Sequence, residues 1–388
     1  EQTEGGDSNA QIILMISTIL REFKMKKLVK ITTAAILFSL IISTNCSAFA
    51  QQKSKQENIK TTKITFNEEK YSNLTLVDKG KHKLLDSNYT DTYINSLSND
   101  VLEDIGNAVS GQQATLYFKE SGTDNNGNPI LKQVNKGVYD KIQKETVDDY
   151  VRNYAKNISV IDKDGNVVYK PIKFKSANTL ESDGGTLKLT NTIYKLKAGP
   201  SAYLMAGQFI WTKMPSYRGK DFYGFVRDTN TVEVPGCFHS IMLYTEQDYM
   251  FLAGNYGVTH TKYGDPIKHQ KDDIPNNAGE NHNAYTMEMN LPSNLMPPAQ
   301  MLQGSSFIAK VYYGLQGGVQ YGQALKQPSI MPQNFNIWLT YLHEKGWKIQ
   351  ISPPSINIPA TGGFSITPYF ESVYDTVIRE PFLLTWDK

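Results

Sequence analysis

Short runs of strand-forming residues follow one another from Gly185 to the end of the chain, with turn residues between them. These runs are rich in β-branched and aromatic residues, which favour extended backbone. Their density predicts an antiparallel β-sandwich or an open barrel for the C-terminal half. The predicted strands cover residues 186–196, 202–212, 222–227, 232–244, 250–260, 284–290, 306–313, 336–342, 347–351, 355–358, 364–367 and 382–386.

Two segments of this half lack the strand pattern. The stretch from Tyr263 to Asn283 is polar and charged, so we predict a long surface loop there. The stretch from Gly314 to Gly322 is rich in glycine. It predicts either a wide loop or strands that pack closely against a neighbour.

The earlier part of the chain has a mixed pattern. Apolar residues recur every three or four positions from Thr90 to Ser110, which predicts a helix with Asp91 at its start and Gly111 at its end. A second helix is predicted over 146–155, followed by a hairpin with an Asp-Gly turn at 162–166. The chain is therefore predicted to be mainly β, with a polar, disordered leader at 51–63, a small α/β domain at 64–175 and a β-sandwich domain at 185–388.

Residues 25–50 have the order of parts of a secretory signal peptide. Lys26, Lys27 and Lys30 form a basic head, residues 34–42 are apolar, and Ala48-Phe49-Ala50 supplies the small residues that a signal peptidase reads. We expect cleavage after Ala50 and a secreted, extracellular protein. The apolar run is shorter than the roughly 20 residues that span a bilayer, so no permanent membrane span is expected in the mature chain.

Two details of the N-terminus bear on processing. Cys46 offers an alternative in which cleavage falls just before this cysteine and a lipid is attached to it. Residues 1–24 precede the signal as an upstream extension, and they are excluded from the prediction of the fold.

Composition excludes some classes of protein. Lys and Arg total 40 and Asp and Glu total 38, so no basic excess points to a nucleic-acid partner or to an anionic membrane surface. Cleavage after Ala50 leaves Cys237 as the single cysteine, which cannot form an internal disulfide. The 23 tyrosines suit strands, and they also suit binding surfaces because the ring is apolar and the hydroxyl is polar.

Motifs of known enzyme classes are missing from the sequence. It has no G-x-S-x-G elbow, no H-E-x-x-H pair, no P-loop and no dinucleotide-binding glycine fingerprint. His343-Glu344 lacks the second histidine that a zinc motif requires four residues after the first. These observations favour a protein that is not an enzyme, and no cofactor is predicted.

One polar stretch contains residue types that ligate metals. The candidates are spread along the predicted loop without the tight spacing of a metal motif, so we predict a solvated loop and no bound metal. They are His260, Asp265, His269, Asp272 and His282.

The most distinctive stretch leaves one predicted strand at Trp211, turns at Pro215 and enters the next at Phe222. Phe209 and Trp211 share a face of the first strand, so we predict that Trp211 is buried between β layers. Pro215 has no N–H for a ladder bond and breaks the sheet. Arg218 and Asp221 are predicted to pair across the turn as a partly exposed salt bridge, or to bond to nearby backbone.

The spacing W-x3-P-x2-R-x2-D in this stretch resembles a pattern found in exported β-rich proteins of Gram-positive bacteria that have no established activity. The resemblance extends over residues 185–388 and includes the tail from Trp338 to His343, the Ile351-Ser-Pro-Pro-Ser-Ile356 segment and the last strand ending at Trp386. It implies secretion and a β fold.

The sequence favours a secreted or surface-associated binding protein without enzymatic activity, whose partner is a surface, a saccharide or another protein. One alternative is a β-type pore-forming or bacteriocin-like toxin, because the strand Thr186–Tyr194 alternates Thr with apolar residues as a barrel-lining strand does. A second alternative is a secreted hydrolase, which would need two carboxylates facing each other in a deep cleft.

Overall fold

The structure is a computed structural model, and it describes residues 61–124, 127–142, 146–171, 184–199, 201–227, 231–272, 276–278, 284–325, 333–344, 355–357, 365–367, 374–376 and 382–386. All of these residues belong to one compact unit. The predicted upstream extension, signal peptide and cleavage site lie outside the described residues.

The described chain is mainly β, with antiparallel sheets that stay open and a few helices in its N-terminal part, as predicted. Six short helices occur in these residues: η1 (Glu68–Tyr71), α2 (Leu76–Asp86), α3 (Asp91–Ile94), α4 (Asn99–Gly106), α5 (Lys136–Tyr139) and α6 (Val147–Ala155). The strands are β1 (Thr62–Thr65), β2 (Ala108–Thr123), β3 (Pro129–Val134), β4 (Ser159–Ile161), β5 (Val167–Tyr169), β6 (Thr186–Leu196), β7 (Tyr203–Lys213), β8 (Lys220–Arg227), β9 (Thr231–Gly254), β10 (Gly257–Asp272), β11 (Asn276–Ala278), β12 (Ala284–Asn290), β13 (Gln300–Leu302), β14 (Ser306–Leu325), β15 (Gln333–Glu344), β16 (Ser355–Asn357), β17 (Ser365–Thr367), β18 (Tyr374–Thr376) and β19 (Phe382–Trp386).

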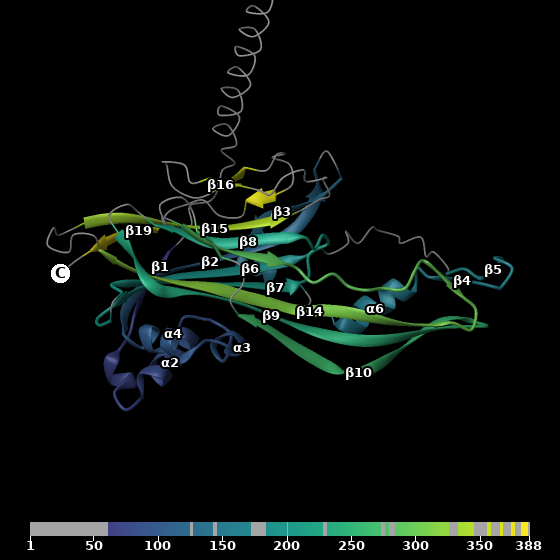
Figure 1. Ribbon diagram of the computed structural model, residues 1–388, viewed down its shortest axis with the longest axis horizontal. Helices are drawn as coiled ribbons and strands as arrows, with labels where there is room; N and C mark the ends of the chain where they lie inside the picture. The colour runs from purple at the N-terminus through teal and green to yellow at the C-terminus, as the bar shows by residue number, and fades with distance from the viewer. Residues whose placement is uncertain are drawn as a thin grey trace, which may run out of the picture. The chain divides into compact units, whose positions relative to one another are not determined.

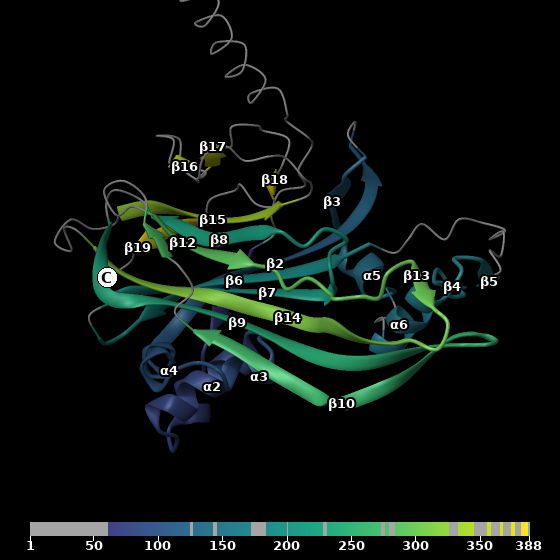
Figure 2. The same cartoon turned by 45° about the vertical axis from the view of Figure 1, so that its right-hand side comes forward.

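Two sheets contain most of these strands. The larger sheet has the order β1-β2-β6-β7-β14-β9-β10, with β3 also paired to β2. The second sheet has the order β11-β12-β8-β15-β18, with β19 also paired to β15. Helices α2, α3 and α4 lie on one side of the larger sheet, and β8 and β15 lie on the other (Figure 1; Figure 2).

Aromatic rings fill the space between the two sheets. The ring of Phe209 on β7 lies 6.0 Å from the ring of Tyr223 on β8 and 5.7 Å from that of Tyr341 on β15. All three side chains are fully buried. Burial of rings of this size contributes strongly to the stability of a sandwich, so this layer forms one half of the core.

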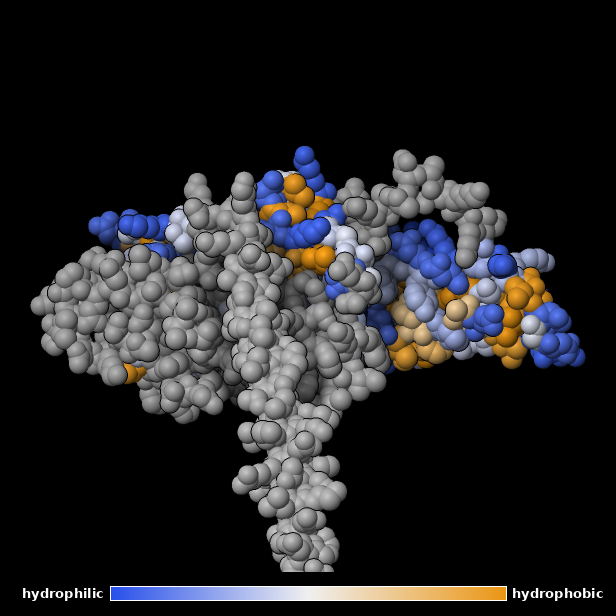
Figure 3. Space-filling model, turned by 90° about the horizontal axis from the view of Figure 1, so that it is seen from above, coloured by the Kyte–Doolittle hydropathy of each residue, from blue (hydrophilic) through white to orange (hydrophobic). Residues whose placement is uncertain are grey.

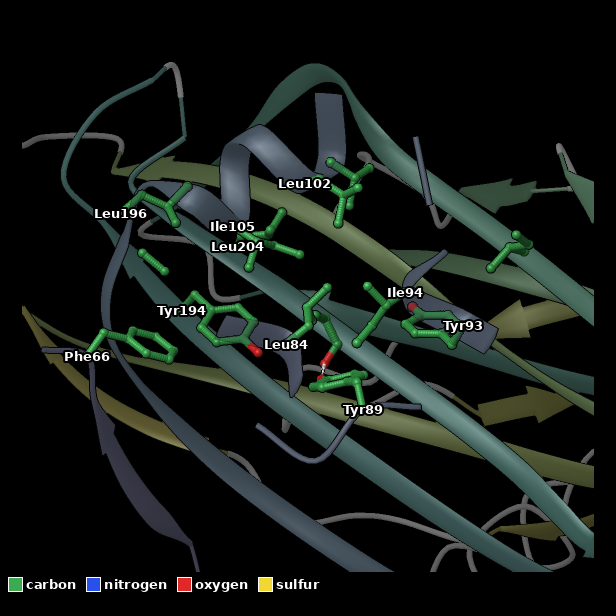
Figure 4. Close-up of a cluster of buried hydrophobic side chains, with 14 of the residues drawn as sticks. Phe66, Leu84, Tyr89, Tyr93, Ile94, Leu102, Ile105, Tyr194, Leu196 and Leu204 are labelled. Carbon is green, nitrogen blue, oxygen red and sulfur yellow. Dashed lines mark hydrogen bonds between the residues drawn. The ribbon is translucent and has the colours of Figure 1, made fainter. Parts of the chain in front are cut away.

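The other half of the core lies between the helices and the larger sheet. Its buried side chains come from α2, α3 and α4 and from β6, β7 and β9, as Figure 4 shows for Leu84, Tyr93 and Tyr194. Helix α2 begins at a cap in which Thr75 Oγ1 accepts a hydrogen bond from the Asp78 N–H at 3.2 Å. Because both faces of β6 and β7 are covered, nearly every residue of these two strands is buried.

Helices α2 and α4 touch through their backbones. A Cβ atom added to Gly80 would lie 1.9 Å from the carbonyl oxygen of Leu102, and one added to Gly106 would lie 2.3 Å from that of Leu76. Only glycine fits at such positions. The Lys83 side chain, buried between the helices, donates to the carbonyl oxygens of Gly106 at 2.8 Å and Ala108 at 2.6 Å, and so satisfies the C-terminal end of α4.

Strands from the N-terminal part and the C-terminal half share the larger sheet. Strand β2 pairs with β6 from Ala108↔Leu196 to Lys119↔Thr186. The segments predicted as an α/β domain and a β-sandwich domain are thus joined through a continuous ladder of hydrogen bonds. Strand β1 includes Thr62 and Lys63, the last residues of the predicted leader.

Several predicted boundaries are wrong. The segment predicted as one helix from Thr90 to Ser110 contains two helices, because the chain turns at residues 95–98 and Ser98 is the N-cap of α4. Gly111, predicted to end the helix, lies inside β2. The loop predicted from Tyr263 to Asn283 contains residues 263–272 of β10 and the short strand β11. Residues 245–249, predicted as a gap, lie within the unbroken strand β9.

The glycine-rich stretch Gly314–Gly322 belongs to strand β14, and the prediction of close packing is confirmed for it. A Cβ atom on Gly317 would lie 2.8 Å from the ring of Phe209, and one on Gly318 would lie 2.5 Å from the hydroxyl of Tyr93. Rings from both halves of the core therefore rest directly on this backbone.

Strand β10 lies at the end of the larger sheet in this order, and residues 261–268 of this strand are all exposed. Its pairing with β9 is interrupted by a bulge between Tyr263 and Ile267, where Gly264 has a φ of 74°. Pro266 lies inside the bulge, and Lys262 and Lys268 flank it. Charge, proline and a bulge are the features that distinguish a protected sheet edge.

Candidate functional site

The predicted corner is a buried junction between the two sheets. Trp211 at the end of β7 is 1% exposed, which confirms its predicted burial between β layers. Its indole Nε1–H donates to the hydroxyl of Tyr341 at 3.0 Å, and its ring lies 5.0 Å from the His343 imidazole. Pro215 is buried after the end of β7, where the sheet ladder stops.

Arg218 and Asp221 bind different partners. The Arg218 guanidinium donates to the carbonyl oxygen of Pro292 at 3.2 Å and to the side chain of Asn294. Asp221 is fully buried and accepts a hydrogen bond from the backbone N–H of Glu344 at 3.1 Å. The bonds to backbone predicted for each residue are present, whereas the predicted partly exposed character of Asp221 is wrong.

Asp221 holds a buried histidine from the neighbouring strand. The Nδ1 atom of His343 on β15 lies 3.0 and 3.1 Å from the two carboxylate oxygens of Asp221 on β8. The Tyr341 hydroxyl donates to the same carboxylate at 2.6 Å. Tyr341 and His343 are two residues apart on β15, so their side chains reach Asp221 from the same face of the strand.

A second buried carboxylate approaches the histidine from the other sheet. Glu120 on β2 has Oε1 3.8 Å from Nε2 of His343, and its carboxylate accepts bonds from the Gly185 N–H at 2.6 Å and the Ser216 hydroxyl at 2.6 Å. Burial alone would lower the pKa of His343, but Asp221 and Glu120 raise this pKa to about 10. The imidazole is therefore a cation at neutral pH.

The pKa of Glu120 is shifted in the opposite direction. Burial alone would raise the pKa of this carboxyl, but the nearby His343 imidazole and the hydrogen bonds from Ser216 and Gly185 lower it. We name Glu120, Asp221 and His343 the ion bridge, because a cation on the second sheet lies between carboxylates of both sheets. All three side chains are at least 96% buried, and an arrangement of this kind holds two layers in one register.

Glu120 and His343 were not predicted to be part of the corner. Glu120 precedes Asp221 by about a hundred residues in the chain, and only the pairing of β2 with β6 brings it there. In the sequence, His343 bears on a zinc motif and ends the Trp338–His343 tail of the resemblance, and neither observation points to the corner. The sequence contains one weak indication of the ion bridge. Tyr341 and His343 are two residues apart, so two polar aromatic side chains lie on one face of a predicted strand.

The metal candidates are scattered in the structure. His260 lies with its ring centroid 6.0 Å from that of Phe251, and His269 stacks on Tyr244 at 4.7 Å with its Nε2 3.0 Å from Glu246. Asp265 is exposed in the bulge of β10, and the side chain of Asp272 and all of His282 lie outside the described residues. Among the side chains that the structure describes, no three of the types His, Cys, Asp and Glu gather as metal ligands do.

Exposed apolar side chains gather where a small three-stranded sheet meets the β9–β10 hairpin. The sheet has the order β13-β4-β5. On one face, Val160 and Met301 are buried against α6 and β9. On the other face the register aligns Leu302, Ile161 and Val167, and Leu302 and Val167 are 51% and 52% exposed.

The turn of the β9–β10 hairpin lies near the end of β13 and beside Tyr169, which packs with the inner face. The Gly304 N–H donates to the carbonyl oxygen of Ala253 at 2.6 Å, and a Cβ atom on Gly257 would lie 2.9 Å from the Tyr169 ring. Tyr256 in this turn is 97% exposed. We name Ile161, Val167, Val168, Tyr256 and Leu302 the apolar tip. Figure 3 shows orange and blue side chains close together in the part of the molecule that contains β4 and β5.

No family model matches this chain, and no curated protein matches it. In the described residues, no helix is both long enough and apolar enough to cross a membrane.

Proposed function

We propose that this is a secreted or surface-associated binding protein without enzymatic activity, and that it contacts its partner through the apolar tip. The observation that carries the proposal is the 97% exposure of Tyr256 at the apex of a hairpin, in the same part of the molecule as the exposed aliphatic side chains of β5 and β13. Large apolar side chains that cluster on a surface mark interaction sites, whereas single ones are common everywhere.

The ion bridge supports the part of the proposal that concerns the lack of enzymatic activity. Its histidine and both carboxylates are buried and engaged with one another, which suits a rigid scaffold. The signal-peptide pattern of residues 25–50 and the resemblance to exported proteins support secretion.

Processing gives the first test. In a secreting Gram-positive host, N-terminal sequencing of the protein from the medium is expected to begin at Gln51. A start at Cys46, or an intact segment 1–50, would contradict the proposed processing.

Binding to cells gives the second test. The labelled protein is incubated with intact bacterial and animal cells and measured by flow cytometry. We expect the double variant Val168→Ser/Tyr256→Ser to lose at least about tenfold in binding, because both side chains belong to the apolar tip. Val138→Ser on α5 is the matched control, since Val138 is 43% exposed and Val168 is 44% exposed. Equal binding by the double variant and the control would exclude the apolar tip as the contact surface.

A further inference from the structure

Strands β14, β9 and β10 run side by side and extend beyond the ends of β8 and β15 (Figure 1; Figure 2). Where the two sheets overlap, the second sheet covers the face of β9 that carries Phe238, whose ring lies 4.9 Å from that of Tyr285 on β12. Side chains of a strand alternate between faces, so the same face continues along β9 at its even-numbered residues. The odd-numbered Tyr249 and Phe251 point the other way and pack with α6.

The registers extend this surface across three strands, because directly opposed residues of neighbouring strands point to the same face. Two of the opposed sets are Ile308, Met250 and Thr261, and Lys310, Asp248 and Tyr263. Leu295 flanks the second set, since it pairs with Lys310 on the side of β14 away from β9 through backbone bonds of 3.0 and 2.8 Å. We name the open face the even-numbered residues 244–252 of β9, the residues opposed to them on β10 and β14, and Leu295.

Apolar side chains are exposed across the open face. At least 40% of each of five large ones is exposed: Leu252, Tyr263, Ile267, Leu295 and Ile308. Ile267 belongs to the face because it lies opposite Glu246. These are five of the twelve exposed large apolar side chains of the described residues, gathered on one side of three strands. Such a concentration marks an interaction surface, whereas scattered single residues do not.

The centre of the open face is polar, and its groups bind one another. Lys310 Nζ lies 3.3 Å from Oδ1 of Asp248 and also binds the carboxylate of Glu246. Oε2 of Glu246 lies 3.0 Å from Nε2 of His269, whose ring stacks on Tyr244. These contacts cross all three strands, so the surface is connected by its side chains as well as by its ladders.

Neither sign of charge dominates the surroundings of the open face. Lys271 lies on the same face, opposite Met242, and Asp265 lies in the bulge of β10. Lys262 and Lys268 are opposed to odd-numbered residues of β9, so they point away from the face. The open face therefore suits a partner of mixed charge, such as the same face of a second copy, in which lysine and carboxylate can meet across the interface. A bilayer fits poorly, because the central carboxylates would lose their contact with water.

The size of the open face also fits a protein partner. At about 4.8 Å between strands and about 3.3 Å per residue, three strands of nine residues cover roughly 430 Å² in projection. Protruding side chains and the flanking Leu295 add to this area. The face thereby approaches the roughly 600 Å² per partner at which specific interfaces begin.

From these observations we infer that two copies of this chain associate through the open face, sheet against sheet, about a two-fold axis. Each copy then contributes the same residues, as in other closed homodimers. The packing continues the sandwich in which the second sheet covers the near part of this face. The inference goes beyond the proposed function, because the apolar tip takes no part in it.

Analytical ultracentrifugation of the protein collected from the culture medium tests the inference. The wild type is expected to sediment as a dimer at high concentration and to dissociate on dilution. Ile308→Glu puts a like charge on both copies and is expected to weaken self-association at least about tenfold. Leu76→Glu on α2 is the matched control, because Leu76 and Ile308 are both 41% exposed. Circular dichroism and the unfolding midpoint establish that both variants are folded.

A spectroscopic variant gives an independent readout. Tyr263→Trp is expected to shift its emission to shorter wavelength as the protein concentration rises, because the ring enters the interface. Tyr256→Trp, at the apolar tip, is expected to give no such change. A shift by Tyr256→Trp and none by Tyr263→Trp would overturn the assignment to the open face.

The possible failures can be told apart. A wild type that stays monomeric up to its solubility limit would overturn the inference and leave the proposed function intact, since binding to cells is tested with variants of the apolar tip. Self-association of Ile308→Glu as strong as that of Leu76→Glu would overturn it too, because the contact would lie elsewhere. A monomeric wild type together with loss of cell binding by Ile308→Glu alone would overturn it in favour of a different partner on this face.

Discussion

At the scale of single residues, Trp211 combines a packing role with a hydrogen bond. Its ring is buried between the sheets, and its indole N–H donates to Tyr341, which in turn donates to Asp221. We expect Trp211→Ala to lower the free energy of unfolding by about 3–5 kcal/mol, as for a large core aromatic. Trp211→Phe keeps most of the ring and should cost less. Urea denaturation measures both, and equal stability of Trp211→Ala and wild type would contradict the packing role.

Asp221 should contribute more to stability than the partly exposed pair predicted from the sequence would. Asp221→Ala leaves the His343 cation buried with only the more distant Glu120 as counter-charge. We therefore expect the free energy of unfolding to fall by roughly 3–5 kcal/mol. An exposed pair would cost on the order of 1 kcal/mol. Lys136→Ala is the control, because its ion pair with Asp140 is exposed. A loss from Asp221→Ala as small as that of the control would show that the bridge contributes little.

The sequence allowed the burial of Trp211 to be predicted, because alternation along one strand is local information. It did not allow the ion bridge to be predicted. Glu120, Asp221 and His343 lie on three strands, and their meeting depends on which strands pair and in which register. No local pattern encodes that pairing.

At the scale of elements, the contact between α2 and α4 depends on glycine. Gly80→Ala would place a methyl group 1.9 Å from the carbonyl oxygen of Leu102, so the helices must move apart. We expect the free energy of unfolding to fall by about 1–3 kcal/mol, as for an overpacked core, even though alanine favours helix more than glycine does. Chemical denaturation measures this change in stability. Gly137→Ala on α5 is the control, because its nearest neighbour would be 3.4 Å away, and equal effects would contradict the role of close contact.

The buried strand β6 was predicted well, and the exposed edge strand β10 was not. The prediction for β6 over Thr186–Leu196 is confirmed to the residue. Its Thr residues lie in the core, where Thr192 accepts a bond from Tyr89, so burial accounts for the alternation that also suggested a barrel-lining strand. Much of β10 is solvated on both faces, so its composition is that of a loop and only its ladder to β9 makes it a strand.

At the scale of the whole molecule, the ion bridge should make stability depend on pH. The pKa of His343 is raised from 6.5 to about 10, so its contribution is complete below 6.5 and is lost as pH rises towards 10. The pKa of Glu120 is lowered from 4.5, so its contribution is present above 4.5 and is lost as pH falls further. The bridge should therefore stabilise most between pH 4.5 and 6.5.

Thermal unfolding can isolate this dependence. We expect the melting temperature of the wild type to fall between pH 6.5 and pH 10 by more than that of His343→Gln, which has no titrating group at this position. Comparison of the two proteins removes the effect of groups elsewhere that ionise near pH 10. Parallel curves for wild type and variant would show that the bridge does not link protonation to folding.

The construction of β10 has a consequence for the behaviour of the protein at high concentration. A long open sheet edge is a template on which another chain can add a strand and start a fibril. The lysines, the bulge at Tyr263 and Pro266 interrupt that template along the exposed part of β10. Replacing Pro266 with Val and Lys262 and Lys268 with Thr would leave the native core untouched and yet produce a sequence prone to amyloid. Colloidal stability is thus encoded separately from thermodynamic stability in this chain, in side chains that contribute little to the folded core.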